Sequence, residues 1–134
     1  VTRQGDLSHY NSCNVLSLHA LLGAYSDEGA QWLDELRPVL ADNIRYACDF
    51  IAAHFPGVQV MQPQGTYMLF LDCAAWLQEH HMTLRELEER GARAGVIWQD
   101  GAAFAWPDSI RMNLALPHSR LVEAMERLRV HAFC

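Results

Sequence analysis

Two stretches in the first half of the chain carry apolar residues at every third or fourth position, which is the spacing of one face of a helix. The first stretch predicts a helix over residues 12–25, with an apolar face made of Val15, Leu18, Leu22 and Tyr25. The second predicts a longer helix that covers residues 33–55. Because Pro38 removes a backbone donor and clashes with the preceding turn, we expect a kink or break near Arg37.

Shorter apolar runs in the second half predict strands. Four runs have this character: residues 58–61, 66–72, 96–98 and 109–116. In residues 66–72 both alternating faces are apolar, since Tyr67, Leu69 and Leu71 face one way while Met68 and Phe70 face the other. A strand of this kind is expected to be covered on both sides.

Two further helices complete the pattern. Thr83 and Glu86 match a capping box, in which each side chain bonds the backbone N–H of the other residue, and this predicts a helix over residues 84–93. A last helix follows Pro117, with an inner face made of Leu121, Val122, Met125 and Leu128. Helices combined with a small mixed or antiparallel sheet predict an α+β fold of two layers.

Arg111 is the main candidate for a functional residue. In the strand predicted for residues 109–116, Ile110, Met112, Leu114 and Leu116 share one face, and Arg111 lies on the other with Ser109, Asn113 and Ala115. A guanidinium on a small, polar face suits a carboxylate ligand, which it binds through two parallel hydrogen bonds. The alternatives are that Arg111 pairs with a protein Asp or Glu, or lies on a solvated face.

The stretch that contains Arg111 also resembles a known family. Residues 95–104 read G-V-x-W-x-D-G-x-x-F, and residues 109–117 read S-I-R-M-N-L-A-L-P. Together with residues 63–72 and the helical residues 28–43, they resemble the C-terminal end of the fold-type I, pyridoxal-phosphate-dependent aminotransferases of class I and II. Within that family the similarity is greatest to the cystathionine β-lyase-like (carbon–sulfur lyase) subgroup.

The resemblance implies roles for several side chains. The arginine that matches Arg111 holds the α-carboxylate of the amino-acid substrate in that family. Tyr67 could line the substrate pocket, or belong to the core with its alternating leucines. Asn113 could orient the guanidinium or a substrate oxygen, or satisfy the neighbouring backbone. Three aromatic residues could shape the pocket mouth or pack against another domain: Trp98, Phe104 and Trp106.

The chain has ten arginines and no lysine, which limits what it can do by itself. Pyridoxal phosphate is carried on a lysine, so no residue here can hold the cofactor covalently, and we assign this chain no catalytic or cofactor-binding residue. We therefore expect a C-terminal small domain that begins after the lysine-bearing segment. Residues 1–25 would be a helix leading back from a large cofactor domain, and residues 26–134 the core of one small domain. The start at Val1 lacks a methionine and a secretory or transit signature.

These expectations favour an enzyme that acts on amino acids, and they leave its reaction open. The intact enzyme would be a cytoplasmic homodimer that uses pyridoxal phosphate and acts on an amino acid, either by transamination or by expelling a thiolate from Cβ. Nothing in these residues decides between the two reactions. The alternative is a non-catalytic module derived from the same fold, which binds amino acids or another protein.

Composition excludes other classes of function. The chain is 51% hydrophobic and lacks an apolar run near the roughly 20 residues that span a bilayer. A net charge of −6 with scattered arginines argues against nucleic-acid binding. The four cysteines form no C-x-x-C pair and are expected to be reduced thiols. Neither the adjacent His80 and His81 nor the pair His9 and Cys13 makes a metal site, so we expect no bound metal.

Overall fold

The computed structural model describes residues 14–134, which divide at Pro38 into two compact units. Helix α2 (Val15–Ala24) belongs to the first unit, and helix α3 (Asp27–His54) begins there. The side chain of Asn14 caps α2 by accepting a hydrogen bond from the Ser17 N–H at 2.8 Å. The helix predicted for residues 12–25 is therefore present from Val15, and its first two residues lie outside the described part. The apolar side chains of α2 are exposed within this unit.

Helix α3 continues through Pro38, so of the predicted kink or break the break is wrong. Proline at position 38 leaves the carbonyl of residue 34 without its helical donor. Both residues are exposed, so water can satisfy that carbonyl and the helix can continue. Beyond Pro38 the helix becomes part of a core, with Asn43, Ile44, Ala47, Phe50 and Ile51 buried. No helix within residues 14–134 has the length and apolar character that crossing a membrane requires.

The second unit contains a four-stranded antiparallel sheet in the order β1-β2-β4-β3. Its strands are β1 (Gln59–Val60), β2 (Met68–Asp72), β3 (Gln99–Asp100) and β4 (Ser109–Asn113). Three of them are shorter than predicted, and β3 follows residues 96–98 instead of including them. The N–H of Val96 donates to the carbonyl of Gly91, which keeps this segment against the end of a helix.

Three helices complete this unit. Helix α4 (Ala74–Glu79) was not predicted, because six residues are too few to establish a helical period. Helix α5 (Leu84–Arg93) begins with the predicted capping box, and both hydrogen bonds between Thr83 and Glu86 are present. Helix α6 (His118–His131) follows Pro117 as predicted. An α+β arrangement of helices on a small antiparallel sheet is thus confirmed.

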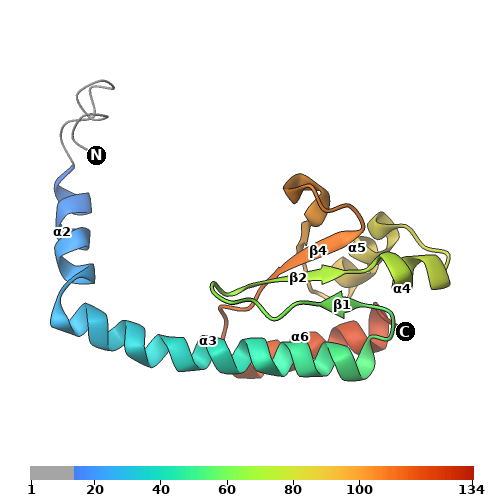
Figure 1. Cartoon of the computed structure of the whole chain (residues 1–134), viewed down its shortest axis with the longest axis horizontal. Helices are drawn as coiled ribbons and strands as arrows, with labels where there is room; N and C mark the ends of the chain where they lie inside the picture. Colours follow the sequence, from blue (N-terminus) through green and yellow to red (C-terminus); the bar gives the residue numbers. More distant parts are fainter. Residues whose placement is uncertain (1–13) are drawn as a thin grey trace. The chain divides into compact units, whose positions relative to one another are not determined.

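One face of the sheet forms the core, and the other is largely open. Leu69 and Leu71 of β2 pair with Met112 and Ile110 of β4, and all four are buried in one cluster with apolar residues of α3 and α6. These two helices lie on one side of the sheet (Figure 1). On the opposite face Met68 and Phe70 are only partly buried. The prediction that both faces of β2 are covered is therefore wrong within the part of the chain described.

A buried amide joins helix α3 to the chain that follows β4. Asn43 is fully buried, and its Nδ2 donates to the carbonyls of Leu114 and Leu116 at 2.9 Å each. Its Oδ1 lies 3.0 Å from Nδ1 of His118, and the ring of His118 meets Tyr46 edge-on. Because Oδ1 can only accept, Nδ1 of His118 is the donor in this hydrogen bond. The network fixes β4 lengthwise against α3.

The packing of Trp98 on Gly91 predicts whether Gly91→Ala raises or lowers the free energy of unfolding. In an unpacked helix Gly91→Ala would be favourable by roughly 1 kcal/mol. A Cβ at Gly91 would overlap the indole of Trp98, so we expect the free energy of unfolding to fall by about 1–3 kcal/mol instead. Urea denaturation followed by circular dichroism measures this change. Gly23→Ala is the matched control, because Gly23 also lies in a helix and nothing lies within 4 Å of its Cβ position. A stabilised Gly91→Ala variant would contradict the packing.

Cys73 provides a prediction about thiol reactivity. Burial raises the pKa of the Cys73 thiol to about 12, and the carboxylates of Asp72 and Asp108 add to the rise. Because the thiolate is the reactive form, we expect iodoacetamide at pH 8 to leave Cys73 unmodified in the folded chain while it modifies the exposed Cys134. Peptide mass spectrometry reads both sites, and urea should expose Cys73. Equal labelling of the two thiols without urea would contradict this burial.

Candidate functional site

The open face of the sheet carries a depression of about 270 Å³ with Arg111 in its wall. Arg111 is on β4, opposite Phe70 of β2 on one side and Gln99 of β3 on the other. The depression is lined by Met68, Ile97, Trp98, Gln99, Arg111 and Asn113. It contains one cation and no acidic group, which is the charge balance expected for an anion site.

Arg111 has neutral contacts only. Its Nη1 donates to Oε1 of Gln99 at 2.6 Å, and its Cζ lies 4.7 Å from the centre of the Phe104 ring. Among residues 14–134 it forms no ion pair with an Asp or Glu, whereas six other arginines do: Arg37, Arg45, Arg85, Arg120, Arg127 and Arg129. Pairing of Arg111 with a described protein carboxylate is therefore excluded.

The loop that brings Phe104 to Arg111 is fixed by its own hydrogen bonds. The 3₁₀ helix η1 (Gly101–Phe104) begins at Asp100, whose Oδ1 accepts from the Ala102 N–H at 2.7 Å. Ser109 Oγ donates to the carbonyl of Trp106 at 2.7 Å. Gly101 is required here, because a Cβ at this position would overlap Ser109 Oγ. Buried Ser109 thus organises the loop instead of lining the site.

The three aromatic residues near this loop separate into two groups. Phe104 meets Phe70 edge-on at 5.6 Å, and Trp106 stacks near Phe70 with ring centres 6.2 Å apart. These rings make an apolar border beside Arg111, and Phe104 and Trp106 remain 47% and 38% exposed. Trp98 instead packs on Gly91 of α5 and belongs to the edge of the core.

Asn113 lies on the Arg111 face and lines the depression. Its Oδ1 accepts a hydrogen bond from the Ala115 N–H at 2.8 Å, so the oxygen is used by the local backbone. Tyr67 precedes β2, and its carbonyl accepts from the Leu114 N–H. Its side chain is 40% exposed and does not line the Arg111 depression. In the structure, Asn113 therefore lies beside Arg111 in the depression, and Tyr67 lies outside it.

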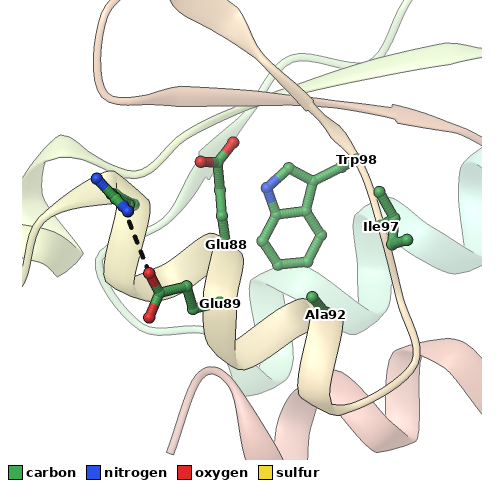
Figure 2. A pocket seen from close by; sticks show the side chains of 6 residues that line it. Glu88, Glu89, Ala92, Ile97 and Trp98 are labelled. Atoms are coloured by element: carbon green, nitrogen blue, oxygen red, sulfur yellow. Dashed lines mark ion pairs between the residues drawn. The ribbon is translucent and has the colours of Figure 1, made fainter.

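A second depression lies between α5 and the segment before β3 (Figure 2). Figure 2 shows the Trp98 ring beside Glu88, and a dashed line marks the ion pair of Glu89 with Arg85, at 3.4 Å. Burial, and then the Asp100 carboxylate, raise the pKa of Glu88. Two acids and one arginine give this depression a net negative charge, so a carboxylate ligand is disfavoured here and favoured at Arg111.

No metal site is present within residues 14–134, where no group of three or more His, Cys, Asp and Glu side chains could hold an ion. His80 stacks on Trp76, with its Nδ1 2.8 Å from the Trp76 carbonyl. The pair His9 and Cys13 lies outside the described residues.

Sequence reasoning missed Gln99, which contacts Arg111 directly. The signal that could have identified it is the spacing of a hairpin. Gln99 and Arg111 flank the Asp100-Gly101 turn and its loop, and they become cross-strand partners only if β3 is placed at residues 99–100. Because the predicted strand ended at residue 98, it did not include Gln99, and the pairing with Arg111 was not predicted.

Comparison with known proteins identifies the family. The sequence profile described as "Aminotransferase class I and II" matches residues 5–128. Protein MalY of Escherichia coli (strain K12) is 33% identical over 122 residues, which make up 88% of this chain and 30% of that protein. Cystathionine beta-lyase PatB of Bacillus subtilis (strain 168) is 28% identical over 119 residues, or 87% of this chain and 30% of that protein.

A solved structure supports the same assignment of fold. The PLP-bound C–S lyase from Staphylococcus hominis aligns with a TM-score of 0.82 at 24% identity, over 96% of this chain and 34% of that one. The chain thus spans about 30% of the length of the curated relatives described here. With its Arg111 strand, its small sheet and a profile match across nearly its whole length, the chain belongs to the class I and II aminotransferase family and is similar to the cystathionine β-lyase-like (C–S lyase) members of it.

Proposed function

We propose that this chain is the C-terminal domain of a pyridoxal-phosphate-dependent enzyme that acts on amino acids, and that Arg111 binds the α-carboxylate of the substrate. The observation that carries the proposal is a half-buried guanidinium on an open sheet face, with an amide and an aromatic ring as partners and no acid. An unneutralised arginine in a depression is the group that binds a carboxylate most strongly.

The cofactor would be held by the remainder of the protein. Pyridoxal phosphate, when bound, supplies an electron sink for the Cα of the amino acid. Its usual anchor is a lysine amine, and this chain contains ten arginines and no lysine. The residues present therefore do not fit the covalent part of a cofactor site, and the role of this chain lies with the substrate.

Arg111 and its neighbours would perform three tasks on that substrate. The guanidinium binds the carboxylate and fixes its orientation. The rings of Phe70 and Phe104 exclude water from one side of the guanidinium, which strengthens the charge interaction. Asn113 offers its amide NH₂ group beside the same depression, because its oxygen already accepts from Ala115.

The similarity to PatB, a cystathionine β-lyase, favours a β-lyase over a transaminase. The proposed reaction expels a thiolate from Cβ of the substrate.

Exposed apolar residues of α2 support a larger assembly, since they would be covered by the large cofactor domain or by the second subunit of a homodimer. Five side chains of α2 have this property: Val15, Leu16, Leu18, Leu21 and Leu22.

Removal of the guanidinium tests the proposal in the complete protein. We expect Arg111→Ala to lower kcat/KM for L-cystathionine by roughly two to four orders of magnitude, because it removes two hydrogen bonds to a charged group. The melting temperature should stay close to that of the wild type, since the apolar face of β4 is unchanged. Arg93→Ala, which removes an exposed arginine of α5, is the control. Unchanged kinetics with a lower melting temperature would make Arg111 a structural residue.

The lack of lysine predicts the behaviour of a polypeptide with only this sequence. Incubated with pyridoxal phosphate and then borohydride, it should form no adduct on a side chain, because it has no ε-amino group. The α-amino group of Val1 is the one amine that can react, and acetylating it should abolish labelling. Peptide mass spectrometry locates any adduct. Stoichiometric labelling at a side chain would refute the division of roles proposed here.

A further inference from the structure

An arginine that recognises a carboxylate must be held in one orientation. The long side chain loses rotamer entropy when it is fixed, and a partner that holds the guanidinium beforehand reduces the loss on binding. On the open face of the sheet Arg111 is only half buried, so packing alone does not fix it. Its orientation depends on the groups that contact the guanidinium.

Two contacts provide this constraint. Phe104 lies against the flat side of the guanidinium, with its ring centre 4.7 Å from Cζ. Gln99 lies at the edge and accepts a hydrogen bond from Nη1 at 2.6 Å. Because a guanidinium has donors only, the oxygen of Gln99 faces Arg111 and its NH₂ group does not. Ring and amide together restrict both the tilt and the in-plane rotation of the guanidinium.

The backbone places Gln99 reliably in this position. Gln99 and Arg111 are direct cross-strand partners of the antiparallel pair β3 and β4. Side chains of such partners emerge on the same face with their Cβ atoms about 4.5–5.5 Å apart. The loop between them is closed by the Asp100 cap and the Ser109 hydroxyl, so the pairing does not depend on a ligand.

The neutrality of Gln99 matters as much as its position. A glutamate of the same shape could accept the same hydrogen bond, but it would form an ion pair with Arg111 and compete with any carboxylate ligand. An amide orients the guanidinium and leaves the positive charge available. The six arginines that pair with acids within residues 14–134 lack that freedom.

From this geometry we infer that Gln99 is a positioning residue, which holds the Arg111 guanidinium ready for a carboxylate ligand through a neutral hydrogen bond. The inference rests on the proposed function, because it assigns Gln99 a role in the same carboxylate site. It adds a specificity determinant: residue 99 must accept a hydrogen bond without carrying charge.

The test uses the complete protein and two probes that differ only at the carboxylate, L-alanine and L-alaninamide. Calorimetry measures the Kd of each probe, so the readout does not depend on turnover. Gln99→Met keeps the length of the side chain and removes the acceptor, whereas Gln99→Glu keeps the acceptor and adds a charge. Gln78→Met and Gln78→Glu make the same changes at an exposed position of α4. Arg111→Ala is combined with each Gln99 variant.

We expect Gln99→Met to raise the Kd of L-alanine about 10-fold, since the guanidinium is no longer held beforehand and loses more rotamer freedom when the ligand binds. Gln99→Glu should raise it about 100-fold, because the new carboxylate occupies the guanidinium. The Kd of L-alaninamide should change less than about 2-fold, since it lacks the anion that Arg111 binds. Both Gln78 variants should bind as the wild type does. With Arg111→Ala, the Gln99 substitutions should have no further effect.

Three outcomes would overturn the inference, and they are distinguishable. If Arg111→Ala weakens L-alanine binding and the Gln99 variants match the Gln78 controls, Gln99 has no positioning role and the proposed function stands. If the Gln99 variants weaken both probes equally, the role of Gln99 is structural. If Arg111→Ala leaves L-alanine binding unchanged, the proposed carboxylate site itself is wrong, and the role of Gln99 fails with it.

Discussion

Burial of one face of strand β4 is the constraint on which the candidate site depends. Ile110 and Met112 pack into the core with Leu69 and Leu71 of β2, and alternation then places Arg111 on the open face. A slip of one residue would exchange the two faces and bury the guanidinium. Since an unpaired buried charge costs several kcal/mol, the hydrophobic core and the position of the cation are specified by the same register.

The loop between β3 and β4 determines which side chains contact Arg111 on the open face. Gly101 leaves room for the Ser109 hydroxyl, which bonds the carbonyl of Trp106 and closes the loop close to the strand ends. The closed loop places Phe104 against the flat side of the Arg111 guanidinium, while the pairing of β3 places Gln99 at its edge. Residues that never contact a ligand therefore determine what the guanidinium can bind.

The sequence predicted the features that rest on local chemistry. The capping box at Thr83, the helix after Pro117 and the alternation around Arg111 each need only a few neighbouring residues, and each is present. The errors concern features that depend on distant contacts. Exposure around Pro38 allows α3 to continue. Trp98 packs against Gly91, and β3 begins after it, at Gln99. Neither the open face of β2 nor the hydrogen bond between Gln99 and Arg111 could be derived without the pairing of strands.

The division of roles in the proposed function has a consequence for dynamics. If this chain binds the carboxylate and the remainder of the protein holds the cofactor, a bound amino acid contacts both parts at once. A ligand shifts a conformational equilibrium by its difference in affinity for the two states, and a closed state, in which both parts reach the amino acid, would offer more contacts than an open one. An oriented Arg111 increases that difference because it loses little entropy on binding. The neutral hydrogen bond from Arg111 to Gln99 would thus favour closure as well as recognition, without adding any contact to the substrate.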